Sequence, residues 1–176
     1  LVSHSVTAGS ATGVRWYELR VNASGVPSLF QAGTFAPDAT SRWMGSAAFD
    51  KVGNIGMIYS GSSTSVKPGI YVTGRLVGDA AGTMTQGETT LQAGGGSQNS
   101  SGLSRWGDYA SVTVDPVDDC TMWSSTEYLP ANGSFNWATR INSFTLPNCT
   151  NQSKLSGTVK DTNGVPIKGV LVEVPG

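Results

Sequence analysis

The segment SAAFDKVGNIGMIYS (residues 46–60) decides the fold, because the chain repeats it as SVTVDPVDDCTMWSS (residues 111–125). The two copies align without a gap, and their identical positions are Ser46/Ser111, Asp50/Asp115, Val52/Val117, Met57/Met122 and Ser60/Ser125. In each copy two short runs of strand-forming residues flank a turn-forming segment, which is typical of a β-hairpin. A hairpin that recurs within one chain indicates a repeat protein.

The similarity continues on both sides of the hairpin. Upstream, SRW stands at 41–43 and again at 104–106. Downstream, GIYVTGRL (69–76) corresponds to FNWATRINSFTL (135–146). Within the complete unit, turn-forming segments separate four strand-like runs, which we expect at about 46–50, 55–60, 69–77 and 87–93.

The N-terminus is a third, incomplete copy of the unit. A single shift aligns it with the complete copy and pairs Val2 with Met57, Ser5 with Ser60, Trp16 with Tyr71 and Arg20 with Arg75. Because one offset serves all four pairs, the match is not explained by chance slippage.

The composition favours an all-β chain that binds neither nucleic acid nor a membrane. Glycine occurs 23 times and few stretches have helical periodicity. Charged residues make up 13% of the chain, compared with about 25% in typical soluble domains. Lys and Arg (11) nearly balance Asp and Glu (12), so no basic surface for nucleic acid is predicted. No apolar run approaches the roughly 18 residues of a membrane span.

Four short antiparallel strands in each repeat indicate a β-propeller blade, and a β-sandwich is the alternative. We expect propeller-like blades at residues 1–25 (partial), 26–80 and 81–149. Propellers close with about four to eight blades. The chain is therefore expected to be an incomplete propeller that belongs to a larger protein or covers its sheet edges with partners.

The recurring hairpin also resembles a known family. Its pattern is S-x-x-φ-D-x-x-x-x-φ-x-M-φ-x-S, where φ is apolar, and it is similar to the first hairpin of secreted bacterial propellers of the sialidase-like superfamily. RWYELR and RWGDYASVTVDPVDDCTMW resemble segments of large exported proteins. The resemblance covers about residues 1–149 and implies a propeller fold and secretion.

The C-terminal segment KLSGTVKDTNGVPIKGVLVEVPG (154–176) resembles the opening of a carboxypeptidase-regulatory-like domain, a small transthyretin-like sandwich. The matching residues include Gly157, Asp161, Gly164 and Pro166. SGTVK and GVLVEV read as strands joined by the turn sequence DTNG. We expect a polar linker at 150–154 and a β-hairpin within 155–176.

The two cysteines, Cys120 and Cys149, could form a disulfide or stay reduced in the core. Neither lies in a CxxC motif, and a single histidine leaves too few ligands for a zinc site. Low charge and abundant Ser, Thr, Gly and Asn favour an oxidising compartment and a Cys120–Cys149 disulfide. The predicted location is extracellular or at the cell surface.

Asp115, Asp118 and Asp119 allow two interpretations. Clustered carboxylates can bind calcium. However, Asp115 recurs as Asp50 at the end of a strand, where a carboxylate can accept backbone N–H groups of the following turn. We therefore predict structural turns at Asp50 and Asp115, with a calcium site as the alternative and no other cofactor or metal.

Arg42-Trp43 and Arg105-Trp106 also recur, and Asp108 follows the second pair. In a propeller these residues would lead into the innermost strand, near the channel mouth where ligands commonly bind. They form the candidate ligand-binding set. The alternative is that the Trp residues pack between blades, with Arg stacked on them or salt-bridged.

The family resemblance bears on catalysis as well. Sialidases bind a substrate carboxylate with several arginines and use an acidic residue and a Tyr/Glu pair. For these roles the chain offers Arg42, Arg105, Asp108, Glu127 and Tyr128. The spacing matches no sialidase pattern, and His4 accompanies no Ser or Cys signature of a triad. No catalytic residue is predicted.

The predicted function is a non-catalytic, extracellular structural or adhesive propeller segment. It would assemble through sheet edges and C-terminal strands, with copies of itself or with the remainder of a larger protein as partners. The alternative is a fragment of a secreted sialidase-like glycosidase or glycan-binding propeller, with glycans as partners.

Overall fold

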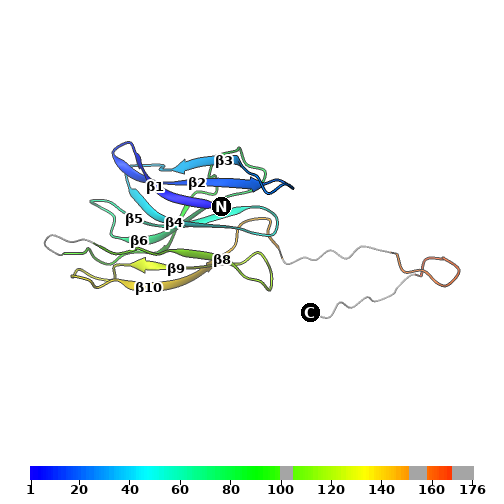
Figure 1. Ribbon diagram of the computed structural model, residues 1–176. Helices are drawn as coiled ribbons and strands as arrows, with labels where there is room; N and C mark the ends of the chain where they lie inside the picture. The colour runs from blue at the N-terminus through cyan, green and yellow to red at the C-terminus, as the bar shows by residue number, and fades with distance from the viewer. Residues whose placement is uncertain (100–104, 151–157, 168–176) are drawn as a thin grey trace.

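The computed structural model describes residues 1–99, 105–150 and 158–167. Within these ranges the chain forms strands and turns, and the all-β prediction is confirmed. None of the described segments forms a helix long and apolar enough to cross a membrane. Ten strands in these ranges form three antiparallel sheets (Figure 1).

The three sheets follow one another along the chain. The first contains β1 (Val2–Ala8), β2 (Ala11–Val21) and β3 (Pro27–Phe35). The second contains β4 (Ser41–Phe49), β5 (Ile55–Ser62), β6 (Gly69–Arg75) and β7 (Glu88–Gln92). The third contains β8 (Ser111–Val114), β9 (Met122–Tyr128) and β10 (Ala138–Phe144). In every sheet each strand pairs with its neighbours in sequence.

The sheets pack face to face, with the second sheet in the middle (Figure 1). Val14 and Trp16 of β2 pack on Met57 and Tyr59 of β5. On the other side of β5, Ile58 belongs to a second core. The buried members of that second core are Ile58, Val72, Val112, Met122 and Leu146. Alternate side chains of one strand thus enter two different cores, as the pleat of a β-strand requires.

β5 and β6 are buried along almost their whole length because sheets cover both of their faces. Gly56 shows how closely the second and third sheets approach, since a Cβ added there would collide with Met122 and Phe144. A glycine within a strand commonly marks such a close approach. The stack has three layers, whereas a β-sandwich has two, and the described residues do not form a closed ring.

One row of paired residues can be matched across the three sheets. The row contains Ser46–Ile58–Val72 in the second sheet, Ser111–Ser125–Ile141 in the third and Ser3–Trp16 in the first. Trp16 and Val72 are both buried against the sheet that follows them in the chain. Corresponding strands therefore occupy corresponding places in the three sheets.

This row shows that the predicted alignment of the N-terminal copy is displaced by one residue in β2. Trp16 corresponds to Val72, and Tyr71 faces the opposite side of its sheet. The turn at residues 9–10 and the connection at residues 62–68 differ in length by an odd number of residues. A one-residue displacement moves a side chain to the other face of a sheet.

The hairpin of the third sheet has a longer turn than that of the second. The turn closes between Asp50 and Asn54 in the second sheet, and between Asp115 and Thr121 in the third. After the turn, residues in equivalent places of the two hairpins are therefore displaced by two positions from the gapless sequence alignment. A displacement of two keeps each side chain on the same face, which explains why the sequence similarity survives.

The sheets divide the chain at positions that differ from the expected units at 1–25, 26–80 and 81–149. β3 pairs with β2 and so belongs to the first sheet, and β7 pairs with β6 and belongs to the second. The repeat alignment contains no identical residues for these two strands in the other copies. Repeat matching therefore did not assign β3 to the first sheet, whereas the four runs expected at about 46–50, 55–60, 69–77 and 87–93 already grouped β7 with β4, β5 and β6.

Residues 158–167 contain the DTNG turn. Lys160 and Pro166 form an isolated antiparallel bridge, and the carboxylate of Asp161 accepts backbone N–H groups within the turn. The remainder of the hairpin expected within 155–176, and residues 151–154 of the expected linker, lie outside the described residues.

Candidate functional site

The second Arg-Trp pair borders a hollow beside the third sheet. Arg105, Trp106 and Asp108 all line it, and its volume is about 250 Å³. The remaining lining residues are Gly107, Tyr109, Glu127, Phe135 and Trp137. Three of the five residues in the candidate ligand-binding set thus share one concave surface.

Three charged groups and one backbone amide shape the polar side of the hollow. Arg105 Nε donates to Asp108 Oδ2 at 2.7 Å, and this hydrogen bond raises the pKa of Arg105. The N–H of Gly107 donates to Glu127 Oε2 at 2.7 Å. Gly107 has a φ of 71°, a conformation that glycine adopts without strain. Glu127 therefore fixes the loop that carries Arg105 and Asp108.

Aromatic rings form the rest of the wall. Phe135 and Trp137 meet edge to face with centroids 5.9 Å apart, and they are 50% and 41% exposed. Trp106 meets Trp43 of β4 in the same way at 5.4 Å, so Trp43 supports the hollow from the second sheet. Exposed rings beside a few charged groups suit a ligand with apolar faces and hydroxyl groups.

Arg42 lies elsewhere and is fully committed to protein partners. Its side chain is 1% exposed. Its Nε and Nη2 donate to the two carboxylate oxygens of Glu88 at 2.6 and 3.0 Å. Its Nη1 and Nη2 donate to Asp38 at 2.9 and 3.1 Å, and Nη1 also donates to the carbonyl of Thr40 at 2.7 Å. All five donors of the guanidinium are used, which leaves none for a ligand.

The charges around Arg42 and the burial of this region shift the pKa values of two neighbouring groups. The hydrogen bond from Arg42 holds the pKa of Asp38 far below its ordinary value. Tyr59 donates its hydroxyl to Glu88 Oε2 at 2.8 Å, and burial, followed by the Glu88 carboxylate, raises the pKa of Tyr59 well above its ordinary value. The cluster is thus an ion-paired arginine whose partner Glu88 also accepts a hydrogen bond from a neutral tyrosine.

The sequence did not single out Phe135, Glu88 or Asp38 as site residues. Trp137 entered the sequence analysis only as part of FNWATRINSFTL (135–146), the counterpart of GIYVTGRL (69–76), and not as a site residue. Glu88 lies 46 positions from Arg42, and no local pattern connects residues so far apart. Two aromatic residues two positions apart, just after the NG turn at 132–133, were the signal for the aromatic wall.

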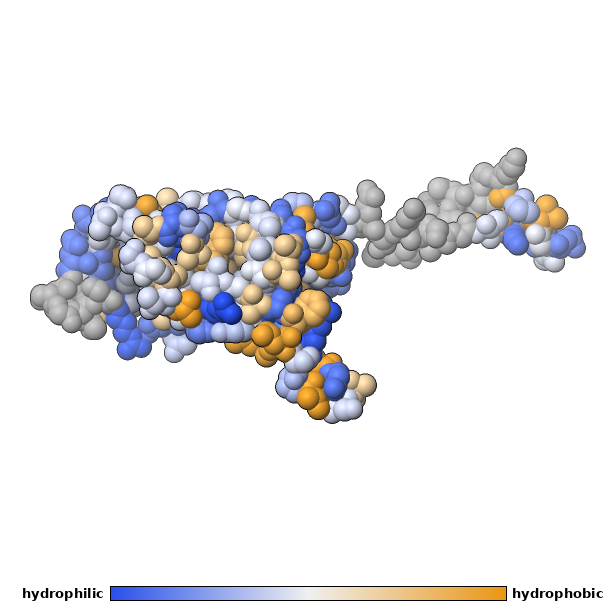
Figure 2. Space-filling view, turned by 90° about the horizontal axis from the view of Figure 1, so that it is seen from above, coloured by the Kyte–Doolittle hydropathy of each residue, from blue (hydrophilic) through white to orange (hydrophobic). Residues whose placement is uncertain are grey.

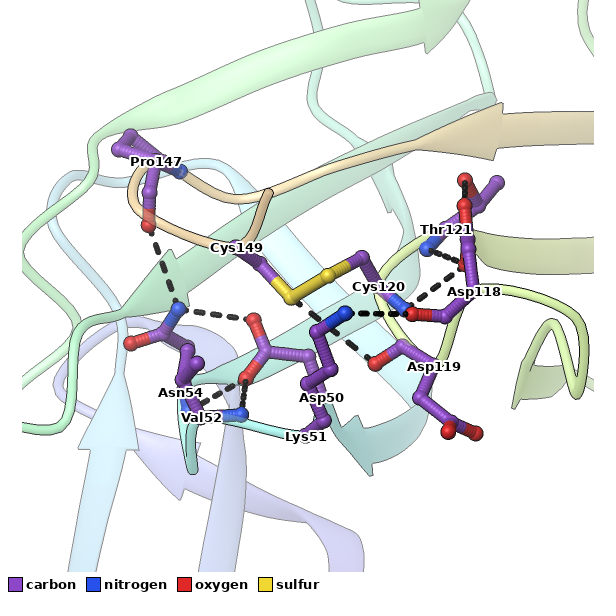
Figure 3. The surroundings of a disulfide bond; sticks show 10 residues. All are labelled: Asp50, Lys51, Val52, Asn54, Asp118, Asp119, Cys120, Thr121, Pro147 and Cys149. Carbon is purple, nitrogen blue, oxygen red and sulfur yellow. Dashed lines mark hydrogen bonds between the residues drawn. A yellow bond between two sulfur atoms is a disulfide. The ribbon is translucent and has the colours of Figure 1, made fainter. Parts of the chain in front are cut away.

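The acidic turn residues bind backbone and side-chain donors of their own turns (Figure 3). Asp50 accepts the N–H groups of Val52 and Asn54 at 3.1 and 2.9 Å and the Asn54 side-chain amide at 2.7 Å. Asp118 accepts the N–H groups of Cys120 and Thr121, both at 2.8 Å. No group of three or more His, Cys, Asp or Glu side chains suited to a metal ion is found among the described residues.

Asp115 serves its turn in a similar way. One carboxylate oxygen accepts the N–H of Val117 at 2.9 Å, and the other accepts Trp123 Nε1 at 2.9 Å. It therefore connects the turn to β9. Asp119 has a positive φ of 54°, and its carbonyl accepts the N–H of Lys51 at 2.8 Å, so the third-sheet turn is tied directly to the second-sheet turn.

The predicted disulfide between Cys120 and Cys149 is confirmed, with an S–S distance of 2.04 Å (Figure 3). It joins the turn before β9 to the segment after β10. On the same side, Asn54 Nδ2 donates to the carbonyl of Pro147 at 3.3 Å. The disulfide and this hydrogen bond hold the end of the third sheet against the second.

His4 is an ordinary residue of a strand. Its ring stacks on Tyr17 with centroids 5.7 Å apart. Its two nitrogens contact the Tyr17 hydroxyl at 3.1 Å and the Ser5 carbonyl at 3.2 Å. These contacts tie β1 to β2 and give His4 a structural role.

Comparison with known proteins adds no family to this geometry. No family model, no curated protein and no solved structure matches the chain. The resemblance to sialidase-like propellers and to the carboxypeptidase-regulatory-like domain therefore stays a prediction. The hollow beside Arg105 and the outer faces of the first and third sheets remain as the candidate functional surfaces.

Proposed function

We propose that the chain is a non-catalytic structural segment of an extracellular propeller-like protein. In this proposal the outer face of the third sheet packs on the outer face of the first sheet of a second copy. The stacking of sheets inside the chain would thus continue from one molecule to the next. The observation that carries the proposal is the exposure of Ile141.

Ile141 occupies the place in the third sheet that Val72 occupies in the second and Trp16 in the first. Trp16 is 1% exposed and Val72 is 8% exposed, because each is covered by the next sheet. Ile141 is 67% exposed. The third sheet therefore presents the same kind of face as the other two, and burying it would be favourable.

The outer face of the first sheet is the natural counterpart. Val2 and Tyr17 are paired on it, and Val2 takes the place that Met57 holds in the second sheet, where the side chain is fully buried. Val2 is 51% exposed. Figure 2 views this side of the molecule and shows apolar residues among hydrophilic ones over the surface.

Each of the two faces carries a charged residue, and these two residues are opposite in sign. Arg15 lies on the first face, over the ring of Tyr17, and Glu127 lies on the third face in the same alternating set as Trp123. Complementary charges favour docking of one face on the other over docking of like faces. A contact between two different faces gives a closed ring or an open filament rather than a two-fold dimer.

An extracellular site of action fits the disulfide. Disulfides persist in oxidising compartments and are rare in the cytosol. The Cys120–Cys149 bond closes the end of the third sheet, so reduction would loosen the sheet whose outer face carries the proposed contact.

The test uses two variants, each blocked on one face. Ile141→Lys places a charge on the third face, and Tyr17→Lys places one on the first face. In sedimentation velocity the unmodified chain is expected to associate as its concentration rises, while each variant alone stays monomeric. An equal mixture of the two variants is expected to form one-to-one pairs, because each keeps the face that the other lacks.

Val26→Lys is the matched control. Val26 is 57% exposed in the turn between β2 and β3, so its substitution is expected to leave association unchanged. A monomeric unmodified chain at all concentrations, or two variants that fail to pair with each other, would contradict the proposal.

A second candidate function is carbohydrate binding in the hollow lined by Arg105 and Trp137. The observation that favours it is the aromatic wall of Phe135 and Trp137 beside Arg105, Asp108 and Glu127. Aromatic faces pack on the apolar faces of sugar rings, while charged groups bind hydroxyl groups.

Screening on a glycan array followed by calorimetry tests this candidate. Trp137→Ala and Arg105→Ala are each expected to weaken binding at least about tenfold, which corresponds to the loss of one good contact. Arg140→Ala, an exposed arginine on β10 that does not line the hollow, is the control. Binding that survives both substitutions, or the absence of any bound glycan, would remove this candidate.

A further inference from the structure

A second buried arginine, Arg75, lies between the first and second sheets and differs sharply from Arg42. Arg75 is 3% exposed. Among the described residues, its side chain makes one hydrogen bond, from Nη2 to the carbonyl of Asp79 at 2.7 Å. Its Nε is buried and has no partner. Arg42, by comparison, uses all five of its donors.

Burying the guanidinium of Arg75 in this way costs free energy unless a hydrogen-bond acceptor is supplied. A buried cation is normally paired and hydrogen-bonded, and no carboxylate among the described residues lies within ion-pair distance of Arg75. Its neighbour Glu18 is already occupied, since Glu18 Oε1 accepts Arg20 Nε at 2.7 Å and Oε2 accepts Gln31 Nε2 at 2.6 Å.

Arg75 lines a cavity of about 220 Å³. Arg20 lines the same cavity, and its side chain is 59% exposed while only its Nε is bonded to Glu18. The apolar part of the wall includes Phe30 and Phe49, which are 53% and 37% exposed. The guanidinium of Arg20 stacks on the ring of Phe30 at 3.3 Å, which fixes its position at the mouth.

We propose that this cavity binds a small monocarboxylate with an apolar body. Its carboxylate would accept N–H groups of Arg75 and Arg20, and its carbon skeleton would contact Phe30 and Phe49. Arginine presents a planar fork of donors that matches a carboxylate. A doubly charged phosphate fits less well, because two carboxylates, those of Glu18 and Asp79, line the same cavity and offset the two positive charges. Both carboxylates already accept hydrogen bonds from neighbouring residues, so neither pairs directly with Arg75.

The site is independent of the proposed assembly. Arg75 faces the interior between the first and second sheets, whereas the proposed contact uses the outer faces of the first and third sheets. Association between copies therefore neither creates nor removes the cavity.

Nuclear magnetic resonance of the isotope-labelled full chain tests the proposal with benzoate as the probe. The Nε–Hε signal of Arg75 is expected to shift with benzoate and to saturate. Inorganic phosphate and neutral benzyl alcohol, at matched ionic strength, are expected to give no saturable shift. No saturation with benzoate, or equal saturation with phosphate, would overturn the assignment.

Variants locate the contact. Arg20→Gln is expected to weaken benzoate binding about tenfold, the loss of one charge-assisted contact, and Arg75→Lys is expected to weaken it at least as much. Arg140→Gln serves as the control and is expected to bind normally. If Arg75→Lys does not fold, the signal of the unmodified chain and the Arg20→Gln titration still decide the matter. Equal affinity in Arg20→Gln and the unmodified chain overturns the proposal.

Discussion

Arg42 and Glu88 form a bidentate ion pair that joins the first and last strands of the second sheet, with Nε 2.6 Å from Oε2 and Nη2 3.0 Å from Oε1. β4 and β7 are the two edges of that sheet. The pair therefore spans all four strands, and Tyr59 of β5 completes it from the middle of the sheet.

Glu88→Gln is expected to lower the free energy of unfolding by roughly 3 kcal/mol. Removing one partner of a buried ion pair leaves an uncompensated charge and costs about 3 to 5 kcal/mol. The lower end applies because Glu88 is 25% exposed. Urea unfolding measures the effect. Asp38→Asn, whose carboxylate is 57% exposed, is the matched comparison and should cost about 1 kcal/mol or less. Equal losses in the two variants would contradict this ranking.

Acid should weaken the Asp38–Arg42 pair. The hydrogen bond from Arg42 lowers the pKa of Asp38 in the folded state below its ordinary value of 3.8. The unfolded state therefore binds the proton first, and stability falls as pH drops from about 5 toward 2. Because Asp38 is exposed, its contribution should not exceed about 1 kcal/mol.

Unfolding curves recorded across this pH range for the unmodified chain and for Asp38→Asn test the point. The variant is expected to lose less stability than the unmodified chain as the pH falls. Parallel curves would show that the pair contributes nothing to the acid sensitivity.

The disulfide should stabilise the third sheet substantially. Cys120 and Cys149 are separated by 29 positions, for which the chain-entropy model gives roughly 3 to 4 kcal/mol. Replacing both cysteines by alanine is expected to lower the unfolding free energy by that amount in calorimetry. Adding a reductant should have the same effect on the unmodified chain and none on the variant. A reductant-sensitive variant would contradict this explanation.

The sequence could predict the features that depend on local pattern. Asp50 and Asp115 recur because both hairpins need a carboxylate that accepts the N–H groups of the turn, and that requirement leaves an identical residue at the same place in each copy. The strands around these turns were placed to within a few residues. The disulfide prediction followed from composition, because low charge and abundant Ser, Thr, Gly and Asn favour an oxidising compartment.

The features that depend on contacts across sheets could not be predicted. Arg42 recurs with Arg105 in SRW, but only the fold shows that Arg42 meets Glu88 whereas Arg105 meets Asp108. The alignment placed Trp16 one residue away from its structural counterpart. Turn length sets the strand register, and matching residue identities does not reveal turn length. In the sequence, Arg75 was only the counterpart of Arg20 in the repeat, and its burial is visible only in the fold.

Gly33 provides a final test of the stacking of the first sheet on the second. It pairs with Trp16 in the common row, and a Cβ added there would collide with the backbone carbonyl of Gly82 and come within 2.9 Å of Trp16 Nε1. Backbone atoms cannot move aside as a flexible side chain does. Gly33→Ala is therefore expected to lower the unfolding free energy by about 1 to 3 kcal/mol, the usual cost of overpacking.

Gly78→Ala is the control for this substitution. A Cβ at Gly78 meets no atom within 4 Å, so its effect should stay within about 0.5 kcal/mol. Urea unfolding followed by tryptophan fluorescence reports both variants, because Trp16 lies beside Gly33 in the buried interface. A Gly33→Ala variant as stable as Gly78→Ala would mean that the segment around Gly82 does not pack closely against the first sheet in solution.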